Sequence, residues 1–500
     1  MVIFMNYQST RGRAAAVNAM QAVLRGLAPD GGLYIGTQML EQFPWQRVLD
    51  MDVRGMAAAI LQALLPDFEG MEELVRRAYD GRFDCDELTP LRTVGDCEIL
   101  ELFHGPTAAF KDVALSMLPQ LMTAAQRQTG GHDEIVILTA TSGDTGKAAL
   151  EGFHDVEGIR IVVFYPQDGV SEVQKAQMVT QEGKNVCVCA VRGNFDDAQT
   201  GVKRIFAACE EQKLLLGRGV QLSSANSINI GRLAPQVVYY FKAYADLMHR
   251  RRIQLGDTVD FVVPTGNFGN ILAGYFAKRM GLPVGRLVCA SNANNVLTEF
   301  LQTGIYDRRR PFYKTSSPSM DILVSSNLER LLFLMTDGNT EKVAAWMREL
   351  QENGVYLVDD AVLQRIRQTF FADSCDEAQT QAAIAALWKK FGYLCDTHTA
   401  VAWHAAQNYR CASATTAPVV VLSTASPYKF PKAVLRAIGQ EPAQSDFAAM
   451  RQLHALTGVP IPQGLASLQG KKVRHHDCIA PEQMLPYVLR KLSEKEWESE

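Results

Sequence analysis

The stretch VDFVVPTGNFGNILAGYFAKRM, residues 259–280, indicates the fold class of this chain. It begins with a short apolar run, passes through a loop with glycines at positions 266 and 269, and continues as a helical pattern that stops at Gly281. A buried strand, a glycine-containing turn and a helix form the repeating unit of parallel α/β proteins. Glycines let backbone N–H groups approach an anion, and the helix dipole favours negative charge. The loop therefore predicts a phosphate site, and an ordinary strand-to-helix turn is the alternative.

Similar apolar runs occur at residues 134–139, 159–164, 186–191 and 419–422. Each is followed by a turn rich in Gly, Ser or Asp, as expected for central strands that are buried on both faces. The first ninety or so residues instead have helical patterns, with helices predicted at 14–25 and 56–65. We therefore predict an α/β protein with two parallel-sheet domains and an additional, mainly helical N-terminal domain.

The predicted boundaries divide the 500 residues into three parts. Residues 1–94 form the N-terminal domain, and residues 95–440 form the α/β core. Within the core, a smaller subdomain covers approximately residues 130–245. Residues 441–500 are a mixed extension that packs on the core, and they include an amphipathic helical pattern from residue 482 onward.

The composition favours a soluble globular protein, with 47% apolar residues, 21% charged residues and a formal net charge of −4. This balance does not favour nucleic acid or an anionic membrane as a partner. The ten cysteines are scattered along the chain, which predicts a reducing cytoplasm rather than a disulfide framework. No signal peptide or membrane span is expected. The cluster HHDC at residues 475–478 is interpreted as a polar surface turn, so we expect no metal.

A second turn, TATSGDTG, lies at residues 139–146 and precedes a helical pattern. Its final glycine and the following lysine resemble a P-loop, but a P-loop needs Gly where Thr141 stands and Ser or Thr where Ala148 stands. What remains is a hydroxyl-rich loop at a helix N-terminus, which suits a small anion such as a carboxylate. Ser142 or Asp144 could also cap the helix, and the two roles are compatible.

A third segment, ELFHGPTAAFKD at residues 101–112, places Lys111 at the start of an apolar helical stretch. Burial and the positive end of the helix dipole both lower the pKa of a lysine, which suits imine formation. Most lysines in such positions are surface residues whose aliphatic part packs on the core. This segment alone leaves both interpretations open.

Together the three segments resemble threonine synthases of the larger class found in bacteria and fungi. Further motifs follow in the same order along most of the chain: YQSTRG (7–12), GLAPDGGL (26–33), FHGPTAAFKD (103–112), TSGDTG (141–146), NSINIGR (226–232), PTGNFGN (264–270), SPSMDI (317–322) and STA (423–425). The resemblance implies a fold-type II pyridoxal-phosphate enzyme. Its expected reaction converts O-phospho-L-homoserine and water to L-threonine and phosphate, the last step of threonine biosynthesis.

The resemblance also implies residue roles. Lys111 would bind pyridoxal 5'-phosphate as an imine and act as the catalytic base. Thr424 would bond to the pyridine nitrogen, where a hydroxyl favours β- and γ-chemistry over transamination. The cofactor phosphate would lie on the loop of Gly266, Asn267, Phe268, Gly269 and Asn270. For the substrate carboxylate we assign Ser142, Gly143, Asp144 and Thr145, and for the substrate phosphate Ser227, Asn229 and Arg232.

Three residues depart from the family pattern. Asp144 stands where many fold-type II enzymes have an Asn that contacts the cofactor's phenolic oxygen, so either Asp144 is protonated or the contact comes from elsewhere, such as Asn226 or Asn229. Ser426 replaces a histidine, and Thr397 replaces a proline.

These departures leave the cofactor intact but weaken the expectation about the substrate, and two alternative functions are open. One is a related phospho-lyase that releases a keto acid, ammonia and phosphate. The other is a non-catalytic binding protein. A monomer or homodimer is the expected assembly.

Overall fold

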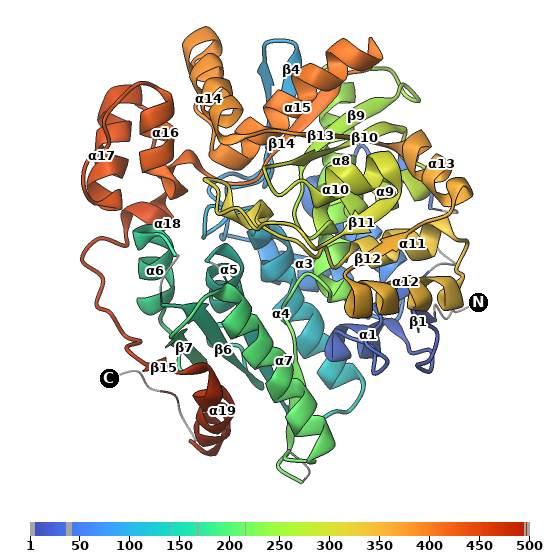
Figure 1. Ribbon diagram of the computed structural model, residues 1–500, viewed down its shortest axis with the longest axis vertical. Coiled ribbons are helices and arrows are strands. Elements are labelled where there is room, and N and C mark those ends of the chain that lie inside the picture. The colour runs from blue at the N-terminus through green and yellow to red at the C-terminus, as the bar shows by residue number, and fades with distance from the viewer. Residues whose placement is uncertain are drawn as a thin grey trace.

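The computed structural model describes residues 6–36, 43–141, 143–167, 170–215, 217–494 and 497. Its core is built on two separate sheets, one in the upper part of Figure 1 and the other at the lower left. This confirms the predicted α/β class with two parallel-sheet domains. Within the described residues, no helix has the length and apolar content needed to cross a membrane.

The larger sheet has six strands, and all neighbours run parallel except the pair at one edge. In spatial order the strands are β13 (Phe370–Ser374), β10 (Val284–Ser291), β9 (Val259–Pro264), β14 (Val419–Ser423), β4 (Cys97–Glu101) and the antiparallel β3 (Leu91–Val94). Helix α15 (Thr397–Ser413) packs on four of them, and α10 (Val296–Thr303) and α9 (Gly269–Arg279) also pack on this sheet.

The smaller sheet has five parallel strands. In spatial order they are β15 (Cys478–Ile479), β7 (Val186–Val191), β6 (Ile159–Pro166), β5 (Glu134–Ala140) and β8 (Val220–Ser223). Along β5, Ile135 and Ile137 join one apolar cluster, and Val136 and Leu138 join another. The strand is therefore buried on both faces, which is why its sequence is continuously apolar.

Five helices come from the part of the chain that forms the smaller sheet: α4 (Lys111–Gln128), α5 (Asp144–Phe153), α6 (Glu172–Val179), α7 (Phe195–Glu211) and α8 (Ile230–His249). Helices α5 and α7 pack on the strands of this sheet, whereas α8 packs on α9 of the larger domain. The C-terminal extension contributes β15 and also α19 (Met484–Ser493), which packs on α7. This part of the chain therefore completes the smaller domain.

The N-terminal part is mainly helical, as predicted. It contains β1 (Tyr7–Ser9), α1 (Ala19–Arg25), β2 (Tyr34–Gly36), η1 (Trp45–Val48), α2 (Val53–Leu64) and α3 (Met71–Tyr79). Helix α1 begins later than the pattern at 14–25 suggests, because Val17 exchanges backbone hydrogen bonds with Tyr7. Asn18 then caps the helix by accepting from the Gln21 N–H.

The remaining elements lie outside the two main sheets. They are β11 (Ile305–Asp307), η2 (Pro318–Met320), α11 (Leu328–Met335), α12 (Thr340–Asn353), β12 (Val355–Leu357), α13 (Asp360–Thr369), α14 (Glu377–Phe391), η3 (Pro427–Lys429), α16 (Pro431–Ala437), α17 (Asp446–Thr457), α18 (Gln463–Ala466) and η4 (Pro481–Gln483). Two of them, η2 and η3, contribute side chains to the site described next.

Candidate active site

Three adjacent strands of the larger sheet bring distant segments to one edge. Because β4, β14 and β9 are parallel neighbours, the turns after their carboxyl ends lie together. The Phe110 N–H, beside Lys111, donates to the Thr424 carbonyl at 2.9 Å. Ala109 and Ala425 also form an antiparallel bridge. The turn that carries the predicted lysine therefore lies directly against buried Thr424.

Lys111 begins α4 and is only 8% exposed. Its Nζ lies 3.2 Å from the Ser319 hydroxyl and 3.6 Å from Oδ2 of Asp144. Burial lowers the pKa of Lys111 to about 8; Asp144 opposes this shift, and the positive charges of Lys429 and Arg232 add to it. An appreciable fraction of the amine is therefore unprotonated and nucleophilic near neutral pH.

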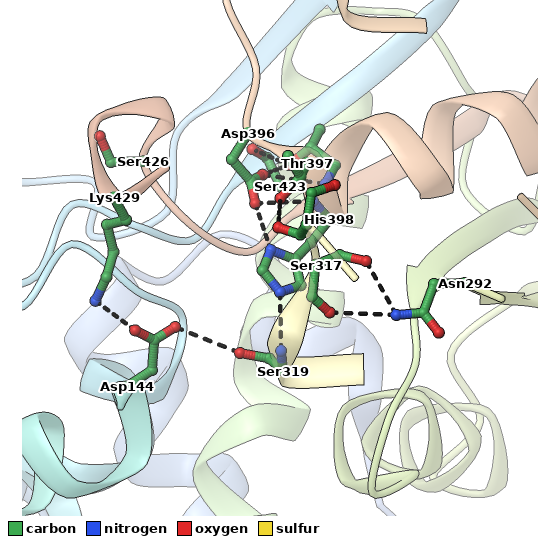
Figure 2. A network of polar contacts seen from close by, with 12 residues as sticks. Asp144, Asn292, Ser317, Ser319, Asp396, Thr397, His398, Ser423, Ser426 and Lys429 are labelled. Atoms are coloured by element: carbon green, nitrogen blue, oxygen red, sulfur yellow. Dashed lines mark hydrogen bonds and ion pairs between the residues drawn. The ribbon is translucent and has the colours of Figure 1, made fainter. Parts of the chain in front are cut away.

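Asp144 carries its charge deep in the protein. Its Oδ1 lies 2.7 Å from the Nζ of fully buried Lys429 (Figure 2). The same oxygen accepts a hydrogen bond from Gln174 Nε2 at 2.9 Å. Burial alone would raise the pKa of Asp144, but Lys429 and Lys111 outweigh it and hold that pKa well below its usual range. The sequence left open whether Asp144 is protonated; these contacts favour its ionised form.

The predicted phosphate loop lies between β9 and α9. The first helical bond of α9 runs from the Leu272 N–H to the Phe268 carbonyl, so the preceding amides have no partner inside the helix. Asn270 Oδ1 accepts from Tyr239 and Tyr240, at 2.6 and 3.0 Å. Its buried Nδ2 has no hydrogen-bond partner within the described part of the chain. Free amides beside an unused buried donor fit a phosphate group.

The loop before α5 offers a second set of free amides. The Thr141 hydroxyl accepts from the N–H groups of Gly143 and Gly146, both at 2.9 Å. The N–H groups of Asp144 and Thr145 precede the first helical bond and have no partner within the helix. They are available for an anion such as a carboxylate. Ser142, predicted for the same role, lies outside the described residues.

The residues assigned to the substrate phosphate differ in their contacts. Arg232 is 3% exposed; its Nη1 donates to the Ala225 carbonyl at 2.9 Å, and its Nε is buried without a partner among the described residues. Burial lowers the pKa of Arg232 to about 10. Ser227 lies beside the phosphate loop, with its Cβ 4.0 Å from the position of a β-carbon on Gly269.

Asn229 has a different environment. Its Nδ2 donates to the carbonyls of Val23 and Ser224 at 2.9 and 3.2 Å, and its Oδ1 accepts from the Gly231 N–H at 2.9 Å. These bonds cap α8 and fix the chain on the N-terminal domain. The geometry therefore gives the Asn229 side chain a structural role.

Several residues of the site received no role from the sequence. Ser319 donates its N–H to His398 Nε2 at 3.2 Å, and His398 Nδ1 lies 2.7 Å from Asp396 Oδ2 (Figure 2). Ser319 belongs to the SPSMDI motif, which was a usable signal. Lys429 follows β14 without any recognisable motif, so nothing in the sequence connected it to Asp144.

Comparison with known proteins identifies the family of this site. Residues 99–362 match the family model of pyridoxal-phosphate dependent enzymes, residues 6–79 the threonine synthase N terminus, and residues 399–483 the threonine synthase C-terminal model. The chain is 40% identical over 447 residues to a threonine synthase of Pseudomonas aeruginosa, covering 88% of this chain and 92% of that relative. The chain belongs to the threonine synthase family.

Solved structures of the threonine synthase family agree with this assignment. A pyridoxal-phosphate-bound threonine synthase from Brucella melitensis has 38% identity and a TM-score of 0.85, covering 98% of both chains. Yeast threonine synthase has 32% identity and the same TM-score, covering 98% of this chain and 99% of that one. Pyridoxal phosphate is the cofactor of this chain, and the free amides, the unused Asn270 donor and the Lys111 amine fit its chemical groups.

Other members of the family carry a different name. Human threonine synthase-like 1 is 37% identical over 501 residues, which cover 95% of this chain and 66% of that relative. This chain therefore spans less than two thirds of the length of these relatives.

Proposed function

We propose that this chain is a threonine synthase, which converts O-phospho-L-homoserine and water to L-threonine and phosphate. The observation that carries the proposal is Arg232, a buried guanidinium whose Nε has no partner among the described residues. A buried charge of this kind needs an anion, and a planar guanidinium binds phosphate in a two-pronged manner. The positive charge of Arg232 contributes to the lowered pKa of Lys111, which supports a phosphate site in the same region as the amine.

We assign the remaining groups as follows. When bound, pyridoxal phosphate stabilises negative charge that develops on the substrate's α-carbon. Lys111 holds the cofactor and then takes up and returns protons at the substrate carbons. The loop Gly266–Asn270 would hold the phosphate group of the cofactor, and Thr424 would bond to the ring nitrogen of the cofactor. The amides of Asp144 and Thr145 bind the substrate carboxylate.

Arg232 and Ser227 bind the substrate phosphate in this proposal. The guanidinium stabilises the charge of the phosphate as it leaves. All ten cysteines are free, which supports our placement of the reaction in a reducing cytoplasm.

A second candidate is a phospho-lyase that uses the same site but releases a keto acid and ammonia. This candidate stays open because Ser426 and Thr397 depart from the family pattern, and because human threonine synthase-like 1, which is 37% identical over 95% of this chain, carries a name other than threonine synthase. The two functions differ in whether water adds to the substrate's β-carbon before the product leaves.

The two candidates are distinguished by their products. The purified protein is incubated with O-phospho-L-homoserine, and threonine, phosphate, keto acid and ammonia are quantified. Threonine and phosphate in equal amounts support the synthase, and keto acid with ammonia and phosphate supports the lyase. The Lys111→Ala variant controls for contaminating activity and is expected to form neither product.

The assignment of Lys111 has its own test. The holoenzyme is reduced with borohydride and digested, and the peptide that carries the pyridoxyl mass is identified. We expect the label on Lys111. A label on another lysine would overturn the site assignments, whatever the products are.

A further inference from the structure

A buried ion pair adjoins the amine of Lys111. Asp144, which is 4% exposed, binds Lys429 through Oδ1 at 2.7 Å and directs Oδ2 toward Lys111 at 3.6 Å. Lys429 is fully buried and also donates to the Thr107 carbonyl at 3.0 Å. One carboxylate thus lies between two lysines, and the pairing with Lys429 is the shorter of the two (Figure 2 draws Asp144 and Lys429).

The charge states of Asp144 and Lys111 determine whether the carboxylate can act as a base. The pKa of Asp144 is held well below its usual range, whereas that of Lys111 is about 8. A proton on Lys111 therefore does not move to Asp144, because the pKa of the carboxyl is lowered and stays below that of the amine. Asp144 is a fixed negative charge and not a base. Next to one lysine alone, such a charge would hold the amine in its protonated, unreactive form.

Lys429 supplies the compensating charge. We propose that Lys429 is a positioning residue for Lys111: by pairing with Asp144, it prevents the carboxylate from fixing the Lys111 amine in a closed ion pair. Asp144 then keeps Lys111 and the Ser319 hydroxyl in place, with Oδ2 lying 3.4 Å from Ser319 Oγ. This inference rests on Lys111 as the cofactor lysine but not on the identity of the product.

Other charged or titratable side chains also lie near Lys111. Arg232 of α8 is positive and lowers the pKa of Lys111 together with Lys429 of η3. Asp112, the next residue of α4, is engaged with the N–H and hydroxyl of Thr107 at 2.9 and 2.6 Å. His398 of α15 bonds to the backbone of Ser319 rather than to the amine. Asp144 is therefore the one anion in this set that faces Lys111 directly.

The test measures how the visible absorbance of the holoenzyme's cofactor changes with pH, because its spectrum reports protonation at the nitrogen of Lys111. Removing the charge of Lys429 in K429M is expected to raise the titration midpoint by about 1 to 3 pH units. D144N is expected to lower the midpoint. The double variant D144N/K429M should return most of the way to the wild-type value.

The control is K147M, which removes another buried lysine of the same region. Lys147 lies in α5, close to Asp144 in the chain, and pairs with Glu151 at 2.8 Å. Its loss should leave the midpoint unchanged. A purely structural role of Lys429 predicts similar effects for K147M and K429M and no rescue by D144N.

The outcomes separate this inference from the proposed function. Borohydride mapping first confirms that the cofactor is on Lys111, and a label elsewhere contradicts the site itself. If the label is on Lys111, an unchanged titration midpoint in K429M overturns the inference about Lys429 but not the proposed function. If K429M does not fold or does not retain the cofactor, the test uses D144N and the double variant D144N/K429M. A titration midpoint that is lower in D144N than in the wild type, and higher in the double variant than in D144N, supports the role of Lys429. Equal midpoints in D144N and the double variant refute it.

Discussion

The carbonyl oxygen of Ser319 lies only 2.5 Å from the position that a β-carbon on Gly266 would occupy. The hydroxyl of the same serine lies 3.2 Å from Lys111 Nζ. Ser319 therefore fills the space between the proposed cofactor lysine and the proposed phosphate loop. The loop can approach η2 this closely because residue 266 has no side chain.

Gly266→Ala should therefore destabilise the protein, because the new methyl group meets backbone atoms that cannot move aside easily. We expect a loss of about 1 to 3 kcal/mol in the free energy of unfolding, measured by chemical denaturation without added cofactor. Gly269→Ala is the matched control, because its β-carbon would meet no protein atom closer than 3.4 Å. Equal losses in both variants would contradict the steric explanation.

Arg232→Met should impair function more than folding. The variant removes a buried charge whose Nε is unpaired, so the ligand-free protein should lose little stability. Without charge-assisted bonds to the substrate phosphate, kcat/KM should fall by about 10- to 100-fold.

Arg330→Met provides the contrast. Arg330 is also buried, but its three nitrogens donate to the carbonyls of Tyr34 and Ile228 and to Asn327 Oδ1. Its loss should lower the thermal unfolding temperature. A larger thermal shift for Arg232→Met than for Arg330→Met would argue against the phosphate role.

His398→Ala should destabilise the buried carboxylate of Asp396, which loses the hydrogen bond from Nδ1 at 2.7 Å. We expect a cost of about 1 to 3 kcal/mol in the free energy of unfolding. His404 lies on the same helix, and its Nε2 is hydrogen-bonded to the side chain of Asn408 at 3.0 Å. His404→Ala should change stability by less than about 0.5 kcal/mol, and denaturation curves of the two variants check the difference.

His104 should make stability depend on alkaline pH. Burial opposes its positive charge, but hydrogen bonds to Asp84, Cys85 and Glu101 prevail and raise the pKa of His104 from 6.5 to about 11. A raised pKa means that the stabilisation is fully present below pH 6.5 and is lost as the pH rises through about 11. The wild type should therefore exceed His104→Gln in stability at pH 6, and the difference should shrink toward pH 10. If the stability difference between the wild type and His104→Gln is the same at pH 6 and pH 10, the positive charge of His104 is not the source of that difference.

The sequence alone indicated the sheets, because local composition reflects local burial. The runs at 134–139 and 186–191 are continuously apolar since both faces of their strands are covered, and the structure places strands there. The same reasoning failed at residues 14–17. There the backbone of Val17 pairs with Tyr7, and the helical pattern gives no sign of that pairing. The domain boundaries proposed from the sequence remain predictions.

The motifs also indicated which turns meet at the site, because parallel strands bring their carboxyl ends to one edge. The loop after β9 was predicted from its strand, glycine and helix pattern, whereas the roles of Lys111 and Thr424 were implied by the resemblance to threonine synthases, and these roles remain predictions. The charge state of Asp144 was not accessible from the sequence. It depends on Lys429, which is distant in the chain and reaches Asp144 only after η3 packs against α5. Periodicity and motifs record a residue's neighbours along the chain, whereas the electrostatics of a buried group are set by neighbours in space, and these only the tertiary structure determines.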